Sequence, residues 1–176
     1  MNLDDFLENP DQNPPILGFR GEYRFLSNFH DPAVNFNGVW FPTVEHAYQA
    51  AKVRDGLWHE VLDKSYLEVF AGLCSPGAAK AAGRNLHPDL IRPNWDDHKV
   101  NIMRTLVEHK FSPFRSDSQV AWLLEKTYPR PIFELNTWGD KFWGVVRDEH
   151  GRLDGENWLG KILMEQRESN RQQVYT

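Results

Sequence analysis

The chain has 176 residues, with 20 basic and 25 acidic side chains and a net charge of −5. This length predicts one domain with a proper core, and the acidic balance argues against broad electrostatic binding to nucleic acid, which needs a basic face. The single cysteine, Cys74, excludes an internal disulfide and a cysteine-built zinc site. No stretch resembles a signal peptide or an apolar run of about 18 residues, so we expect a soluble cytoplasmic protein without membrane contact.

The first part of the chain is strand-like. Residues 1–15 are polar and acidic and carry three prolines, which indicates a flexible N-terminal arm before a domain over residues 16–168. Short strands are predicted at 16–19 and within 34–41. The pair Asn37-Gly38, between alternating residues, is typical of a type I′ hairpin turn.

Helical patterns dominate the rest of the chain. Ser75 and Pro76 carry the cap and first-position signature of a helix start. A short strand is expected at 132–135, an exposed hairpin at 147–153 and a polar tail at 169–176. The predicted class is α+β, a single domain with several helices around a small antiparallel sheet. The helices are expected at 43–54, 57–70, 75–84, 94–111, from Ser116 or Asp117 through Leu124, and at 157–168.

The segment Thr43–Lys52 carries an unusual polar face. Glu45, Gln49 and Lys52 stand at i, i+4 and i+7, which places them on one side of a helix whose flanks are small or apolar. Ionisable groups in such a setting are costly unless they are paired or used. A structural alternative remains open, because Glu45 follows a Thr43 cap and Lys52 lies near the helix end, where each charge favours the helix dipole.

Three further clusters combine polar and aromatic residues, at 25–29, at 92–96, and at 136–144 with 154–161. In the first cluster, Ser and Asn beside aromatics suit hydrogen bonding to a stacked ring, although an ordinary Asx turn uses the same residues. In the last, glycines beside Trp allow a ligand to approach the backbone closely. The residues 155–157 precede a helix, whose N-terminus is a natural seat for phosphate, or simply a capped end.

Together these clusters closely resemble the NADAR family, also called the YbiA-like N-glycosidases. The resemblance implies the NADAR fold and cleavage of an N-glycosidic bond between a base-like group and a ribose phosphate or ADP-ribose, with no metal and no cofactor. Substrates in the family include phosphoribosylated aminopyrimidines of riboflavin synthesis and ADP-ribose attached to guanine in nucleic acid. The matching blocks are Leu26–Phe29, Phe41–Lys52, Arg92–Asp96, Asp140–Gly144 and Gly155–Arg167.

This chemistry suggests roles for individual residues. Breaking a ribosyl C–N bond builds positive charge on the sugar, which a carboxylate can stabilise while an acid assists the leaving nitrogen. Glu45 and Asp140 are the expected carboxylates, with Glu134 as a weaker candidate. Lys52 is expected to attack an opened ribose aldehyde as an amine, and direct attack by water is the alternative route. The expected substrate-binding residues are Asn28, Phe29, Tyr48, Gln49, Trp95, Trp143, Gly144 and Asn157.

A non-catalytic NAD or ADP-ribose binding module is the main competing interpretation. It would use the same pocket without turnover, but binding alone does not need the trio Glu45, Lys52 and Asp140. His46 is interpreted as a pocket-edge or capping residue and not as a metal ligand. The leaving group and the oligomeric state stay open at this point.

Overall fold

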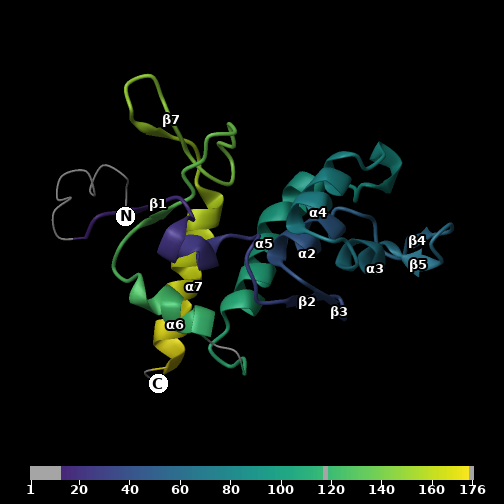
Figure 1. Cartoon of the computed structure of the whole chain (residues 1–176), viewed down its shortest axis with the longest axis horizontal. Helices are drawn as coiled ribbons and strands as arrows, with labels where there is room; N and C mark the ends of the chain where they lie inside the picture. The colour runs from purple at the N-terminus through teal and green to yellow at the C-terminus, as the bar shows by residue number, and fades with distance from the viewer. Residues whose placement is uncertain (1–12, 117–118, 175–176) are drawn as a thin grey trace. The chain divides into compact units, whose positions relative to one another are not determined.

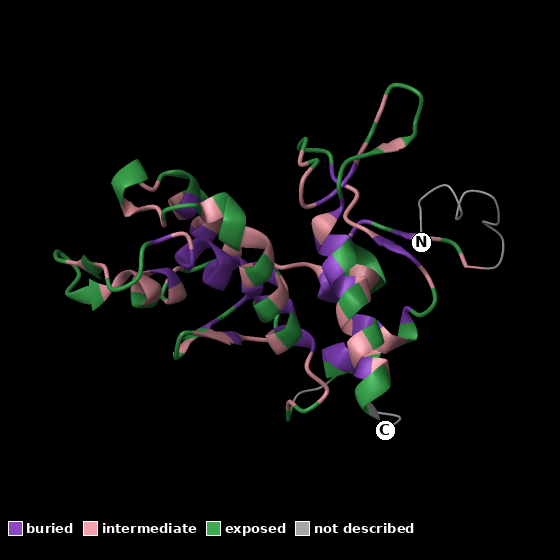
Figure 2. Ribbon diagram, turned by 180° about the vertical axis from the view of Figure 1, so that it is seen from behind, coloured by how far each residue is buried: buried purple, intermediate pink, exposed green. Residues whose placement is uncertain are grey.

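The computed structural model describes residues 13–116 and 119–174, which form two compact units (Figure 1). The central unit is Ser27–Ser112, and the terminal unit contains the described residues of Met1–Leu26 and Pro113–Thr176. Most of the arm expected at 1–15 therefore lies outside the described residues. Each unit has buried segments of its own (Figure 2), and each is described separately below.

The central unit begins with the predicted hairpin. Strands β2 (Val34–Phe36) and β3 (Val39–Phe41) pair antiparallel, with Val34 opposite Phe41. Asn37 and Gly38 both have positive φ, 49° and 83°, as a type I′ turn requires. Val34 and Phe41 are fully buried, so the hairpin contributes one face to the core of this unit.

Helix α2 (Val44–Ala50) lies at the centre of this unit, against α3 (Tyr66–Ala71), α4 (Pro76–Arg84) and α5 (Trp95–Phe111). Every residue of α2 is buried, and it is drawn in purple among its neighbours in Figure 2. The helix ends four residues before the predicted end at 54. The backbone N–H of Arg92 donates to the Lys52 carbonyl at 2.6 Å, and Val53 forms a bridge with Ile91, so pairing with residues 91–92 replaces the last helical turn.

The helix predicted over 57–70 is wrong in its first half. Strands β4 (Trp58–His59) and β5 (Lys64–Ser65) form a hairpin there, followed by α3. Ser65 and Glu68 make a complete capping box at the start of α3, a signal that fixes the true helix start. Two other predicted starts are confirmed: Ser75 caps α4 with Pro76 at its first position, and α5 begins after Asn94. The cap expected at Ser116 or Asp117 is not tested, because residues 117–118 lie outside the described residues. A single 3-10 turn, η2 (Pro88–Leu90), joins α4 to α5.

The terminal unit is built on α7 (Trp158–Val174), which packs against α6 (Gln119–Lys126) and β6 (Ile132–Phe133). Strand β1 (Ile16–Leu17) pairs with β6 in parallel and leads into the 3-10 helix η1 (Gly21–Leu26). Helix α7 continues six residues beyond the predicted end at 168, so the expected tail at 169–176 begins inside it.

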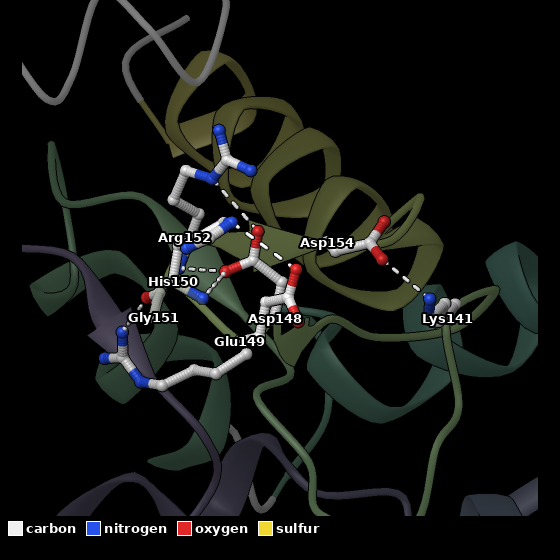
Figure 3. A network of polar contacts seen from close by, with 8 residues as sticks. Lys141, Asp148, Glu149, His150, Gly151, Arg152 and Asp154 are labelled. Atoms are coloured by element: carbon white, nitrogen blue, oxygen red, sulfur yellow. Dashed lines mark hydrogen bonds and ion pairs between the residues drawn. The ribbon is translucent and has the colours of Figure 1, made fainter.

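The exposed hairpin expected at 147–153 is confirmed as β7 (Val146–Arg147) and β8 (Leu153–Asp154). Its turn is organised by Asp148, whose carboxylate accepts from the backbone of His150 and from the backbone and side chain of Arg152 (Figure 3). At the base of the hairpin, Lys141 forms an ion pair with Asp154 at 2.6 Å. These contacts make a self-contained surface turn.

The α+β class is confirmed, with one refinement. In the described residues the strands form four separate two-stranded pairs, three antiparallel and one parallel, and not one continuous sheet. The helices therefore provide most of the framework of both units. Within the described ranges, no helix has the length and apolar character to cross a membrane.

Candidate active site

Glu45 is a buried carboxylate in the middle of the central unit. Its side chain is 6% exposed, and Gln49 Nε2 donates to its Oε1 at 2.7 Å. Burial raises the pKa of Glu45, and the Gln49 hydrogen bond and the charges of Lys80, Lys52 and Arg84 oppose that rise. The i, i+4 pair predicted from the sequence therefore forms. A carboxyl group with a raised pKa is suited to carry a catalytic proton.

Lys52 interacts electrostatically with the same carboxylate. Burial lowers the pKa of Lys52, Glu45 raises it, and the neighbouring cations Arg84 and Lys80 lower it further. Its Nζ lies 5.8 Å from the centroid of the Tyr48 ring. A lysine whose pKa is lowered by an apolar environment and by other cations has a larger neutral, nucleophilic fraction near neutral pH.

Two cations of the site, Lys80 and Arg84, were missed by the sequence analysis. Both lie on α4 and act electrostatically on Glu45 and Lys52. On an Ala-rich helix, a Lys and an Arg four residues apart resemble an ordinary solvated face. Only the packing of α4 on α2 brings them to Glu45.

Gly83 explains how α4 approaches so closely. A Cβ atom at Gly83 would lie 1.9 Å from Oε1 and 2.7 Å from Cδ of Gln49. The absence of a side chain at Gly83 therefore lets α4 lie directly over Gln49. The signal in the sequence was a glycine in a helix interior, which is unfavourable there unless close packing requires it.

Gln49 also presents an unused acceptor. Its Oε1 is buried and has no hydrogen-bond partner among the described residues, while its Nε2 is bonded to Glu45. Buried polar atoms without partners are uncommon in native proteins and often mark functional sites. This atom lies under Gly83 of α4, in the same side chain whose Nε2 bonds the Glu45 carboxylate.

The expected aromatic residues Tyr48 and Trp95 lie together next to Lys52. Their ring centroids are 5.3 Å apart with a tilt of 57°. Arg92, from the same motif as Trp95, clamps the backbone around Lys52: its Nε donates to the Ala51 carbonyl at 3.3 Å, and its guanidinium holds Asp55 through two hydrogen bonds. Arg92 thus fixes the segment that follows α2 and carries Lys52.

The turn over residues 27–30 brings two more expected residues to α2. The Asn28 carbonyl accepts from the Glu45 backbone N–H at 3.0 Å, and its side-chain nitrogen contacts Met103 Sδ at 3.5 Å. Phe29 is 40% exposed, and Lys80 Nζ lies 5.6 Å from its ring centroid. Asn28 thus has structural contacts on both sides, whereas the Phe29 ring remains accessible at the edge of the site.

The remaining expected residues, Asp140, Trp143, Gly144 and Asn157, belong to the terminal unit. Asp140 Oδ1 accepts from the backbone N–H groups of Phe142 at 3.1 Å and of Trp143 at 2.9 Å. Asn136 braces the same loop, donating to the Asp140 carbonyl at 2.7 Å and accepting from its N–H at 3.0 Å. One oxygen of Asp140 therefore shapes the loop that carries Trp143.

The start of α7 does not form the phosphate seat considered from the sequence. The N–H groups of Asn157, Trp158 and Leu159 already donate to carbonyls of residues 142–144. The buried Asn157 side chain accepts from Glu134 N at 3.0 Å and donates to the Ile132 carbonyl at 2.9 Å. These contacts show that the Asn157 side chain links β6 to the start of α7.

Gly144 is also tightly enclosed. A Cβ atom there would lie 2.2 Å from the Glu134 carbonyl oxygen. The missing side chain at Gly144 therefore serves the close packing of two backbone segments.

His46 has a structural role in α2. Thr43 Oγ1 lies 2.9 Å from its Nδ1, and the Leu73 carbonyl lies 3.2 Å from its Nε2. Because a carbonyl can only accept, Nε2 carries the proton and Nδ1 accepts from Thr43 in the neutral ring. Burial lowers the pKa of His46, which favours this neutral form.

Comparison with known proteins shows the family of this chain. The family model of the NADAR domain matches residues 18–171, which span both units. The chain belongs to the NADAR family. It is 34% identical over 147 residues to the N-glycosidase YbiA of Shigella flexneri, covering 84% of this chain and 81% of that protein.

Two other NADAR relatives extend the comparison. A riboflavin biosynthesis protein of Vibrio vulnificus is 30% identical over 164 residues, covering 93% of this chain but 37% of that longer protein. The solution structure of the Escherichia coli protein YbiA matches with a TM-score of 0.69 and 30% identity, covering 93% of this chain and 89% of that one. The NADAR fold expected from the sequence motifs is thus confirmed.

Proposed function

We propose that this NADAR protein is an N-glycosidase that hydrolyses phosphoribosylated aminopyrimidines to the free amine and ribose 5-phosphate. The relatives support the reaction class, because one is named as an N-glycosidase and another as a riboflavin biosynthesis protein. The central unit supports it with a set of groups suited to sugar chemistry. A small phosphorylated substrate also agrees with a chain of net charge −5 whose cations gather locally at α4.

The observation that carries the proposal is that Glu45, a buried carboxyl group bonded to Gln49, and Lys52 act electrostatically on each other. Burial raises the pKa of the carboxyl group and lowers the pKa of the amine, so each is brought toward the form in which it can exchange protons near neutral pH. A surface ion pair that only stabilised the helix would not need either group to be desolvated. Both groups are therefore proposed to act on the substrate.

The proposed reaction proceeds through an imine. The Glu45 carboxyl group protonates the ring oxygen as the ribosylamine opens. The neutral Lys52 amine then attacks C1′, a C–N bond forms, and the aminopyrimidine leaves as a free amine after taking up a proton. Water adds to the Lys52 imine, and ribose 5-phosphate and the free lysine are released, so no oxidant or reductant is needed.

The cations of α4 are proposed to bind the phosphate. Lys80 and Arg84 are two cations that act on the single carboxylate of Glu45, so the charge around this carboxylate is positive even when the Lys52 amine is neutral. Arg and Lys are the usual partners of phosphate oxygens. Removing the phosphate from the substrate should therefore weaken binding more than catalysis.

Aromatic side chains are proposed to hold the pyrimidine. Phe29, Tyr48 and Trp95 belong to the central unit, and Trp143 remains a proposal from the terminal unit. Asp140 also remains a proposed second carboxylate, held by the backbone of its own loop. The variant Asp140→Asn, which keeps the shape of the side chain, tests that role by its effect on kcat.

A hydrolysis assay followed by mass spectrometry tests the proposal. The purified protein and its Glu45→Gln variant would each receive a phosphoribosylaminopyrimidine, its dephosphorylated analogue, guanine-ADP-ribosylated oligonucleotide and NAD. We expect ribose 5-phosphate from the first compound with the wild-type protein alone. Thermal stabilisation by a ligand without any product would contradict the proposal and support a non-catalytic NAD or ADP-ribose binding module.

We also propose that the enzyme acts in the cytoplasm. Cys74 is a free, exposed thiol, which suits a reducing compartment. Cell fractionation with an antibody to the protein tests this location.

A further inference from the structure

Lys110 is a buried lysine that the reaction described above does not use. It lies near the end of α5 and is only 1% exposed. Its Nζ donates to the carbonyl of Ser27 at 2.7 Å and to the carbonyl of His30 at 2.9 Å, and lies 5.1 Å from the Phe111 ring centroid. Lysine is almost never fully buried unless its head group has partners, so this position calls for an explanation.

The two carbonyls that Lys110 binds are the ends of one turn. Within the turn, the His30 N–H donates to the Ser27 carbonyl at 3.1 Å, and the Phe29 N–H donates to Ser27 Oγ at 3.1 Å. Lys110 therefore closes the turn from the side of α5, in a place where backbone carbonyls need a donor.

The middle of this turn contacts the proposed active site. The Asn28 carbonyl accepts from the Glu45 N–H at 3.0 Å, so the turn is bonded to the first turn of α2. The ring of Phe29 lies under Lys80, at the exposed edge of the same site. One buried side chain thus connects α5 to both the carboxylate helix and a candidate substrate-stacking ring.

Packing alone does not account for a lysine at this position. The buried face of α5 is otherwise apolar, with Met103, Leu106, Val107 and Phe111. A methionine would fill a similar volume without the cost of desolvating an amine. Burial lowers the pKa of Lys110 to about 7, against the attraction of Asp31, yet even the neutral amine keeps two N–H donors for its two carbonyls.

We propose that Lys110 is a positioning residue of the proposed glycosidase: it fixes the turn over residues 27–30 so that Phe29 stacks on the substrate's base. The inference rests on the proposed function for its kinetic consequence, but its structural part can be measured separately. Since α2 is also held by its Thr43 cap and by α4, loss of Lys110 affects the turn more than Glu45. The main effect is therefore on substrate binding.

The test compares Lys110→Met, Phe29→Ala and the double variant, with Lys99→Met as the matched control. Lys99 is on the same helix but pairs with exposed Asp96 at 2.7 Å. We expect KM to rise about tenfold in Lys110→Met, the size of one lost aromatic stacking contact, while kcat changes little. The KM of the double variant should be no higher than that of Phe29→Ala, because both changes remove the same contact.

Amide hydrogen exchange provides the readout that does not depend on turnover. In Lys110→Met the N–H groups of His30 and Glu45 should lose protection, whereas in Lys99→Met they should keep it. Unchanged protection, or additive losses in the double variant, would overturn the inference. If Lys110→Met does not fold, Lys110→Gln keeps two N–H donors on a side chain one atom shorter, which should weaken its bonds to the two carbonyls and give an intermediate KM. A wild-type KM in it would also overturn the inference. A wild-type protein without turnover would contradict the proposed function alone.

Discussion

At the scale of single residues, the site depends on a conflict between burial and charge. Glu45 and Lys52 are both partly or fully withdrawn from water, and each tunes the other. The sequence indicated this pair through an expected helix face, although α2 ends at Ala50 and Lys52 lies in the turn that follows it. The sequence could not reveal the roles of Lys80, Arg84 or Lys110. In the sequence each resembles an ordinary basic residue of a helix, and only tertiary packing brings it to its partners.

Replacing Glu45 by Gln separates function from stability. Because burial raises the pKa of Glu45, the folded protein disfavours the ionised form, and this cost to stability grows as the pH rises above 4.5. Glu45→Gln should therefore lower kcat by about 10²–10⁴-fold while leaving the melting temperature at pH 7 equal or higher. Kinetics and thermal unfolding check this, with exposed Glu60→Gln as the control. A fully active Glu45→Gln enzyme would remove Glu45 from the mechanism.

The pH dependence of the reaction follows from the same two groups. Glu45 should titrate above 4.5 and Lys52 below 10.5, so kcat/KM should be bell-shaped with both limbs between these values. In Glu45→Gln one limb should disappear, because one of the two titrating groups is gone. A profile with both limbs unchanged in that variant would assign the titration to other residues.

At the scale of elements, the local signals with a clear physical basis predicted the structure well. The Asn37-Gly38 turn, the Ser75-Pro76 helix start and the long helix α5 are all confirmed. The helix expected over 57–70 failed because its apolar residues suited a helical pattern while the capping box placed the real start at Tyr66. The pairing of β1 with β6 joins residues more than a hundred positions apart, and no local pattern encodes such a contact.

The contact between α2 and α4 gives a prediction about an element. Gly83→Ala should place a methyl group where Gln49 now lies, forcing the helices apart at a cost of about 1–3 kcal/mol and lowering activity by disturbing the Gln49–Glu45 hydrogen bond. Gly77→Ala is the matched control on the same helix, since its Cβ would meet only Ser75 Oγ at 3.8 Å. Chemical denaturation and kinetics should show loss in the first variant and equal or higher stability in the second.

At the scale of the whole molecule, one family model spans two compact units. The central unit holds Glu45, Gln49 and Lys52, and the terminal unit holds the Asp140 loop and Asn157. The sequence motifs marked both sets of residues, but they could not distinguish residues that contact a ligand from residues that support the backbone. Asn157 and Gly144 show the difference, since their structural contacts became visible only with the backbone around them.

The stability of the molecule should also depend on pH through Lys110. Its pKa of about 7 lies below the 10.5 of an unfolded lysine, so the unfolded chain binds more protons between these values and stability should increase with pH there. Between pH 7 and pH 9 the contribution is about 2 kcal/mol. Denaturation of the wild-type protein and of Lys110→Met at several pH values measures this contribution. It should appear as a pH-dependent difference between their free energies of unfolding. A constant difference would mean that Lys110 does not lose a proton in this range.

The measurement that tests the central claim most directly is borohydride trapping during turnover of a phosphoribosylaminopyrimidine, followed by peptide mass mapping. The account predicts a reduced ribose 5-phosphate adduct on Lys52, formed at a lower rate in Glu45→Gln. Turnover without any adduct, or an adduct on Lys80 instead, would contradict the assignment of Lys52 as the nucleophile of this site.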